Sequence, residues 1–595
     1  GDNLTWTYTD DGVLRISGTG DMYDYTYFLY SNPVPWKNFR SSVTQIVFDD
    51  TVTSIGDYAF SGFYGITAVT LPARLKSIGN SAFNSCQYLR SVTIPATVER
   101  IGAYAFLYVN AVITVLNPDC VFGSEYIDAI GADGEGVLRG YDDSTTQAYA
   151  DAHAISFYSL DTGELNYLSN NDGHQNYYVD SRVAQPVESY LFENADGTLT
   201  RVEWAYFTIL AETYDREYNR LSQTLIDGEL DIFGGFYCGE TYNFLVFGQY
   251  NLEEDDSKEV IRVVKYSKDW ERLGSASLCG ANTTKPFDAG TVRFAEYNGM
   301  LYIATSHEMY TYSDGYNHQA NLTFCVRESD MAITDQYSGI MNWNYGYVSH
   351  SFNQFIAIDG DTILTVNHGD GAPRSVVLIR YDTKAGNNTF TRQSPYCSHV
   401  EVLPITGNIG DNFTGVSVGG FVVSDSSYLV AGNSILQDGT VDFDGQRNIF
   451  LTVTDKNNFS DAGTELKWLT DYKDGDGVDV STPQLAKING DLFLIMWTED
   501  GVFTYEFVDG KTQELEKFFL LIDEIDRVDE WEKAINALFV GAPAEIYVTG
   551  SSETLAENIS VLLPENCDVL KMYPLPFAEV EKIYSSAALE RYLHF

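Results

Sequence analysis

Cysteine is scarce and scattered in this sequence, basic residues are few, and long apolar runs are missing. The seven cysteines include no C-x-x-C pair, a distribution that favours neither a disulfide framework nor a zinc site. No apolar stretch approaches the roughly 18 residues that a membrane-spanning helix needs. The chain begins without a signal-like segment, so we expect any export signal to have been removed or never to have been there. We therefore predict no membrane insertion.

The shortage of positive charge excludes two classes of partner. Lys and Arg number 36 against 84 Asp and Glu, which gives a formal net charge of -48. An excess of this size repels phosphate backbones and anionic lipid headgroups, so nucleic acid and membrane surfaces are poor partners. The abundant residues are aromatics, with 42 Tyr and 34 Phe, and 49 Gly. Together with Thr and Val, they favour strands and tight turns over helices.

An internal repeat occupies the first part of the chain. Ile55, Ile78 and Ile101 are each 23 residues apart. The same step relates Gly56, Gly79 and Gly102; Ala59, Ala82 and Ala105; Phe60, Phe83 and Phe106; and Val69, Val92 and Val115. A fixed period in the twenties is typical of a solenoid, in which each unit buries its apolar ridge on its neighbour. We expect a short strand at Thr67–Leu71, a returning turn or short helix at Ile78–Phe83, and the three phenylalanines stacked in the core.

The repeated units VTSIGDYAFSG, LKSIGNSAFNS and VERIGAYAFLY resemble the BspA-type leucine-rich repeats of bacterial surface proteins. The opening GDNLTWTYTDDGVLRISGTGDMYDY, followed by Pro35–Trp36, resembles the β-hairpin cap of that family, and Gly140–Leu160 resembles its closing cap. The resemblance covers residues 1–160. It implies an extracellular or cell-surface location and a role in binding a host or matrix protein or glycan.

The second region, residues 161–512, shows strand pairs joined by Asn-Gly or Asp-Gly turns. Asn298–His307 and Asp359–His368 share a turn, an apolar strand and a final His, and Asn489–Thr498 repeats the pattern with Thr. With looser copies and an early unit around Val187–Trp204, about six units are present. They predict a mainly β fold in which a β-propeller of about six blades follows the solenoid. A pair of β-sandwiches is the alternative.

The third region, residues 513–595, alternates apolar strands with a helical segment, as a small α/β segment does. Its pieces LLIDEI, DEWEKAINAL, IYVTGSS and MYPLPFAEV resemble part of a bacterial AAA-like P-loop ATPase. The resemblance implies that Asp523 holds magnesium and that Glu524 polarises the attacking water. The phosphate-binding loop is missing, however, because Gly510-Lys511-Thr512 lacks the earlier glycine, which is Tyr505 here. We therefore interpret this segment as an incomplete, inactive ATPase and expect no cofactor.

A polar constellation in the propeller-like region is the candidate ligand site. The matched positions of His307 and His368 predict that both lie at the same end of the disc, with Gln249 and Asn433 at equivalent places. The candidate ligand-binding residues are His307, Glu308, His318, His350, His368, Asp370, Arg374, Gln249 and Asn433. Planar donors and acceptors beside Tyr310 and Tyr312 suit a glycan or a peptide. The alternative interpretation is that these side chains satisfy buried loop backbone.

These patterns favour a non-catalytic binding protein for a host or matrix glycan or protein. The alternative is a glycan-active hydrolase or lyase that uses His307, His350, His368 and Arg374. No H-E-x-x-H motif and no sialidase-type Asp-box are present, which argues against that alternative. Zinc binding by His307 and His368 lacks a third ligand. The acidic stretch Asp471–Asp479 is interpreted as a solvated loop and not as a calcium loop, and no metal site is predicted.

Overall fold

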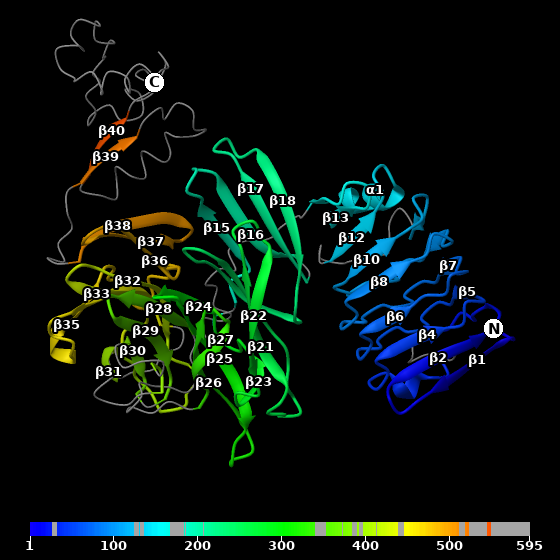
Figure 1. Ribbon diagram of the computed structural model, residues 1–595, viewed down its shortest axis with the longest axis horizontal. Helices are drawn as coiled ribbons and strands as arrows, with labels where there is room; N and C mark the ends of the chain where they lie inside the picture. Colours follow the sequence, from blue (N-terminus) through cyan, green and yellow to red (C-terminus); the bar gives the residue numbers. More distant parts are fainter. Residues whose placement is uncertain are drawn as a thin grey trace, which may run out of the picture. The chain divides into compact units, whose positions relative to one another are not determined.

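A computed structural model describes residues 1–26, 33–123, 130, 136–166, 184, 186–205, 207–339, 353–371, 373–383, 389–391, 397–411, 413–437 and 445–510, and the strands 518–522 and 544–548. Most of the regular structure is β-strand. The chain divides into two compact units, residues 1–179 with 184–339 and residues 180–183 with 340–595. Each unit is described by itself (Figure 1).

The first unit begins with a solenoid of about five turns, as the 23-residue repeat predicts. Two flanks of parallel strands form it, and each turn contributes one strand to each flank. One flank contains β2 (Val13–Gly18), β4 (Gln45–Phe48), β6 (Ala68–Thr70), β8 (Ser91–Ile94), β10 (Val112–Val115), β12 (Val137–Gly140) and β13 (Ser156–Ser159). The other contains β3 (Gly20–Asp21), β5 (Val52–Ile55), β7 (Ser77–Ile78), β9 (Arg100–Ile101) and β11 (Val121–Phe122).

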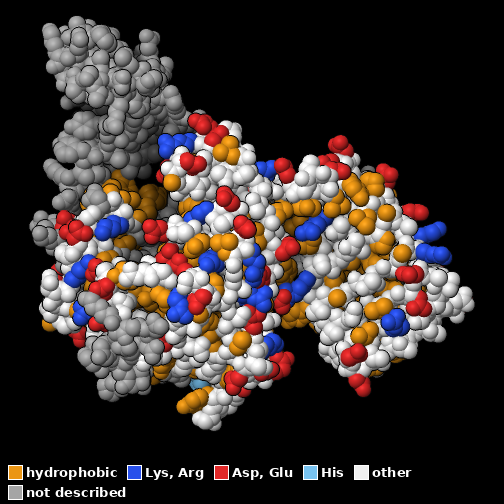
Figure 2. Space-filling model, viewed as in Figure 1, with side chains coloured by type: hydrophobic (Ala, Val, Ile, Leu, Met, Phe, Trp, Pro, Cys, Tyr) orange, Lys and Arg blue, Asp and Glu red, His pale blue; other side chains and the backbone are white. Residues whose placement is uncertain are grey.

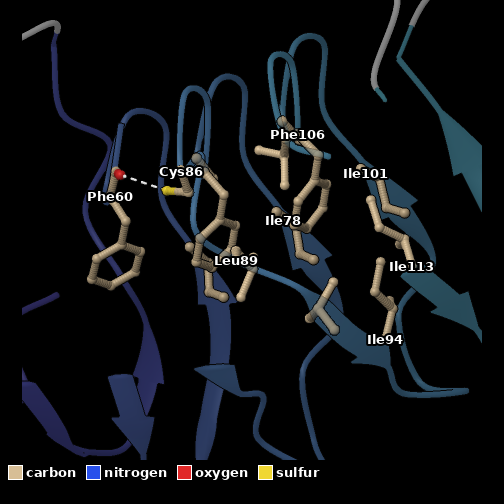
Figure 3. Packing of buried hydrophobic residues seen from close by; sticks show 14 of the residues in the cluster. Phe60, Ile78, Cys86, Leu89, Ile94, Ile101, Phe106 and Ile113 are labelled. Atoms are coloured by element: carbon tan, nitrogen blue, oxygen red, sulfur yellow. Dashed lines mark hydrogen bonds between the residues drawn. The ribbon is translucent and has the colours of Figure 1, made fainter. Parts of the chain in front are cut away.

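The solenoid core is built from the repeated apolar columns (Figure 3). Phe83 stacks between Phe60 and Phe106, with ring centroids 5.3 and 5.2 Å apart, which confirms the predicted stack. The backbone supports this ladder, because the Phe60 N–H donates to Ala82 and the Phe83 N–H donates to Ala105, both at 2.8 Å. All three rings are fully buried. Each turn therefore buries its apolar surface on the next one.

The register departs from the strict repeat at one place. Val92 on β8 lies opposite Ile113 on β10, and Val115 lies opposite Ile94. A strict 23-residue step would place Val115 opposite Val92, so the strand register differs from the sequence repeat here. The turn that follows Phe106 is two residues shorter than the one that follows Phe83, and the strand after it is displaced accordingly.

Both ends of the solenoid have the predicted caps. At the start, β1 (Leu4–Tyr8) pairs antiparallel with β2 and forms a hairpin. At the end, helix α1 (Thr145–Ala152) precedes β13, which pairs antiparallel with β14 (Leu165–Asn166). The side chain of Ser144 caps α1 by accepting the N–H of Gln147. The antiparallel strands β1 and β14 thus cover the two ends of the flank that runs from β2 to β13.

Six antiparallel sheets follow, in the arrangement of a six-bladed β-propeller, as the sequence predicts. Three belong to the first unit. Blade 1 contains β15 (Ser189–Glu193), β16 (Leu199–Ala205), β17 (Thr208–Tyr214) and β18 (Arg220–Asp227). Blade 2 contains β19 (Ile232–Cys238), β20 (Asn243–Gly248), β21 (Glu259–Tyr266) and β22 (Arg272–Cys279). Blade 3 contains β23 (Thr283–Pro286), β24 (Arg293–Tyr297), β25 (Met300–Thr311), β26 (Asn317–Arg327) and β27 (Ala332–Tyr337).

The second unit holds three further blades. Blade 4 contains β28 (Gln354–Asp359), β29 (Thr362–Gly369), β30 (Ser375–Asp382) and β31 (Cys397–Pro404). Blade 5 contains β32 (Val416–Val423), β33 (Ser427–Ser434), β34 (Asn448–Asp455) and β35 (Thr464–Trp468). Blade 6 contains β36 (Gln484–Asn489), β37 (Leu492–Glu499) and β38 (Val502–Asp509). The first strands β28, β32 and β36 contact in sequence, as the inner strands of radially arranged blades do.

Within the first unit, the end of the solenoid packs on blade 1. Arg90 joins Asp231 at 2.7 Å and lies 4.7 Å over the ring of Phe207. The side-chain amide of Gln223 binds both backbone groups of Leu165, each at 2.8 Å. A shared apolar cluster lies beside these contacts and contains Val112, Val137, Leu165, Ala205 and Leu210. The last strands of the solenoid therefore form one packed body with the first blade.

The C-terminal region contributes two described strands, β39 (Phe518–Ile522) and β40 (Ala544–Val548). They pair in parallel, with Phe518 opposite Ala544. Parallel neighbours need a crossover connection, so this pairing agrees with the α/β character predicted for the segment. Among the described residues, no helix has the length and apolar content required to span a bilayer.

Candidate functional site

The candidate site lies on blade 3, whose central hairpin is longer than that of blade 2. Strands β25 and β26 have 12 and 11 residues, whereas β20 and β21 of blade 2 have 6 and 8. Figure 1 shows this long hairpin extending past the rest of its sheet. Its turn closes with the Tyr312 N–H donating to Tyr316 and the Gly315 N–H donating to Tyr312, both at 2.9 Å. Gly315 has φ +86°, a conformation that a residue with a Cβ rarely adopts.

Aromatic side chains are exposed at the tip of this hairpin. Tyr312 is 58% exposed and Tyr316 is 71% exposed. His318 lies edge-on to Tyr312, with ring centroids 6.0 Å apart, and its Nε2 is 2.7 Å from Asp314 Oδ2. The Tyr316 N–H and His318 together hold the pKa of Asp314 below its usual value. The tip thus presents aromatic faces and a carboxylate. Figure 2 shows hydrophobic side chains and a pale blue histidine at the lower end of the molecule.

A loop of blade 2 supports the platform from the side. Asn251 is fully buried, and its Nδ2 donates to the Tyr310 hydroxyl at 3.0 Å. Glu254 accepts the backbone N–H of Thr311 at 2.7 Å. The same loop exposes Tyr250 at 49% and Leu252 at 66%. Blades 2 and 3 thus both expose side chains beside these hydrogen bonds, and we call the set Tyr250, Leu252, Tyr312, Asp314, Tyr316 and His318 the hairpin surface.

Two further predicted residues lie at this end of blades 2 and 3. Glu308 accepts the Thr284 hydroxyl at 2.8 Å and the ammonium of Lys285 at 2.6 Å. The bond to Glu308 raises the pKa of Lys285. Gln249 donates from Nε2 to the carbonyl of Glu259 at 2.8 Å and so extends the pairing of β20 with β21. Glu308 and Gln249 thus hold the strand ends that carry the hairpin surface.

His307 is fully buried on β25. Its Nδ1 lies 2.6 Å from the Thr283 hydroxyl, and its Nε2 has no hydrogen-bond partner in the described part of the chain. Burial lowers the pKa of His307 to about 3, so the ring is neutral at physiological pH. In this conformation the ring is out of reach of a ligand at the surface.

In the second unit, the predicted residues bind segments that connect strands. His368 is fully buried with Nε2 at 2.8 Å from the Thr414 hydroxyl, and burial lowers its pKa to about 3. Asn433 donates to the carbonyl of Val480 at 2.8 Å. Arg374 donates to the carbonyls of Thr406, Asp411 and Phe413, and the carbonyl of buried Asp370 accepts the Gly410 N–H. His350, Asp523 and Glu524 lie outside the described residues.

The structure thus brings Glu308, His318 and Gln249 together at one end of blades 2 and 3. It places His368, Asp370, Arg374 and Asn433 in the other unit. The sequence analysis missed Tyr250, Leu252, Asp314 and Tyr316. The signal that would have found them is the spacing between Asn298 and Arg327, because it is too long for the short hairpins of the other blades. The ligand-binding role of the predicted residues stays a prediction.

Two known protein families match parts of this chain, one near its N-terminus and one near its C-terminus. Residues 37–121 match the family described as BspA type Leucine rich repeat region, in six copies. Residues 482–581 match the family described as AAA domain. The second match begins just before β36 and includes the parallel pair β39 and β40.

Known proteins and solved structures are similar to parts of this chain. An uncharacterised protein of Haemophilus influenzae is 32% identical over 132 residues, which cover 22% of this chain and 32% of that protein. The match therefore spans about a third of that relative. A leucine-rich repeat protein from Eubacterium ventriosum is 23% identical, with 24% of this chain and 43% of that chain covered and a TM-score of 0.20. The α-L-arabinanase of Cellvibrio cellulosa is 9% identical, with 46% and 90% covered and a TM-score of 0.24.

Proposed function

We propose that this protein is a non-catalytic binding protein of a bacterial cell surface, and that the hairpin surface contacts a glycan of a host or matrix. The match of the solenoid to BspA-type repeats supports the surface location. The observation that carries the binding role is the pair of exposed tyrosines, Tyr312 and Tyr316, at the tip of a hairpin that its own hydrogen bonds hold in shape.

The chemistry of the hairpin surface suits sugar rings. Tyrosine combines an apolar face with a polar hydroxyl, so it packs on the C–H face of a pyranose and still forms hydrogen bonds. Asp314 is held ionised and accepts hydroxyl protons. Because the turn is already ordered by the bonds of Tyr312, Gly315 and Asp314, less conformational entropy is lost on binding. The charge of -48 disfavours anionic glycans, so we expect a neutral ligand.

The first test is a glycan array probed with the full chain and with Tyr312→Ala plus Tyr316→Ala. We expect specific binding by the wild type and a loss of about tenfold or more in the double variant, because the stacking faces are removed. Tyr218→Ala is the matched control, since Tyr218 is 75% exposed on the β17–β18 turn of blade 1. A double variant that keeps the whole wild-type glycan profile, or a profile that falls equally with Tyr218→Ala, would contradict the proposal.

A further inference from the structure

The solenoid has a groove along the flank of short strands that is separate from the hairpin surface. Its volume is about 350 Å³. Four successive turns line it, from the N-terminal cap to the turn that contains β9. Its polar lining includes Asp21, Asp24, Ser54, Asp57, Ser77 and Arg100. Since each turn contributes residues in order, the groove runs along the solenoid axis.

The glycine column keeps the backbone of successive turns close together beneath this groove. A Cβ on Gly79 would lie 2.5 Å from the backbone nitrogen of Asp57, and one on Gly102 would lie 2.6 Å from that of Asn80. Contacts this short are forbidden, so only glycine permits the close approach. The glycines therefore let each turn lie directly against the backbone of the turn before it.

A ladder of side chains fixes the wall of the groove. The Asp57 N–H donates to Asp24, the Asn80 N–H donates to Asp57 at 2.6 Å, and the Ala103 N–H donates to Asn80 at 2.9 Å. Each of these side chains thus accepts a backbone N–H of the following turn. One polar side chain therefore recurs in every turn along the groove. Ser54, Ser77 and Arg100 form a second polar column beside it. The groove therefore offers donors and acceptors at a regular spacing.

The spacing of the turns identifies the kind of molecule that fits. Stacked rings in the core are 5.3 and 5.2 Å apart, so neighbouring turns advance by about the spacing of parallel strands. Sugars in an extended polysaccharide advance by a similar distance, and every second ring presents the same face. Tyr58 and Tyr104 occupy equivalent positions two turns apart, so they match the spacing of every second sugar ring. Tyr104 is 41% exposed.

The charges of the groove exclude polyanions. Three carboxylates, Asp21, Asp24 and Asp57, stand against one guanidinium, Arg100, in a chain of net charge -48. A uronic-acid or sulfated polymer would be repelled. We infer that this groove binds an extended, uncharged polysaccharide strand along the solenoid axis, with hydroxyls on the Asp57 and Ser77 columns. This site is independent of the one proposed on blade 3.

The test is isothermal titration of the full chain with cello- and chito-oligosaccharides of three and six sugars. We expect the hexamers to bind at least several-fold tighter than the trimers, because a longer strand contacts more turns. Ser77→Trp fills the groove and should weaken binding of the hexamers by about tenfold or more. Thr70→Trp is the matched control, since Thr70 is exposed on β6 of the opposite flank; it should leave binding unchanged.

Arg100→Ala provides a second variant without added bulk, in case Ser77→Trp impairs folding. It should weaken hexamer binding while the circular dichroism spectrum stays that of the wild type. No binding of any neutral hexamer, or equal affinity in wild type and Arg100→Ala, would overturn the inference. The double variant Tyr312→Ala plus Tyr316→Ala should retain hexamer binding, so failure of the blade 3 proposal and failure of this one are distinguishable.

Discussion

At the scale of single residues, Glu328 shows how burial sets the charge of a side chain. It follows β26, its side chain is 6% exposed, and its Oε1 has no hydrogen-bond partner among the described residues. The ammonium of Lys265 bonds at 2.6 Å to the backbone carbonyl of Glu328 and lies over the Tyr242 ring. Burial, followed by the negative charge of Glu296, raises the pKa of Glu328 to about 7.

This pKa predicts a pH-dependent stability. An acid whose folded pKa exceeds its unfolded value of 4.5 contributes stability that is fully present below pH 4.5. That stability is lost as the pH rises through about 7. Glu328→Gln should therefore raise the free energy of unfolding at pH 8 by about 3 kcal/mol relative to wild type, with no such gain at pH 4. Thermal melts at both values check this. The exposed Glu217→Gln is the control, and an equal gain at both pH values would contradict the explanation.

The histidines show what the sequence predicts at this scale and what it does not. The shared spacing from Asn298 to His307 and from Asp359 to His368 predicts equivalent strand positions. Both lie on the strand that follows the turn, but β25 continues to Thr311 beyond His307, whereas β29 ends at Gly369, directly after His368. Their burial was not predictable from that spacing. It depends on Thr283 and Thr414, which are 24 and 46 residues away along the chain.

At the scale of elements, the solenoid turn was the most predictable part of the molecule. A repeated Ile-Gly-x-x-Ala-Phe pattern predicts one strand, one turn and one buried ring per unit, because such a unit buries its ridge only on its neighbours. The pattern did not predict the slip that places Val92 opposite Ile113, since the shortened turn still contains apolar residues. The length of the β25–β26 hairpin was missed for a related reason, because polar residues at its tip resemble any loop.

The central ring of the Phe column should carry a large share of solenoid stability. Phe83 is fully buried and contacts a ring on each side, so Phe83→Ala leaves a cavity that the rigid ladder cannot close. We expect a loss of about 3–5 kcal/mol in the free energy of unfolding. Urea titration measures it. Tyr88→Ala, at a side chain that is 60% exposed in the same turn, should cost less than about 0.5 kcal/mol. Similar losses in the two variants would show that the stack does not determine stability.

At the scale of the molecule, the sequence predicts the order of solenoid, blades and C-terminal segment. Period, turn motifs and composition each change along the chain, and those changes mark the three regions. The attachment of the solenoid to blade 1 was not predictable, because it rests on Arg90, Phe207, Gln223 and Asp231. These residues are scattered in sequence and belong to no motif.

The bidentate bond of Gln223 makes this attachment measurable. Gln223 accepts the Leu165 N–H and donates to the Leu165 carbonyl, as a neighbouring strand would. Removing the amide leaves a half-buried backbone pair without its partner, which costs about 1–3 kcal/mol. In Gln223→Ala we therefore expect the Leu165 amide to exchange with deuterium about tenfold faster or more, while amides around Phe83 keep their wild-type rates. Ser222→Ala, at an exposed position on the same strand, is the control. Unchanged exchange at Leu165 in Gln223→Ala would mean that the Gln223 amide does not hold the solenoid on the blade, and that the apolar cluster and the contacts of Arg90 suffice.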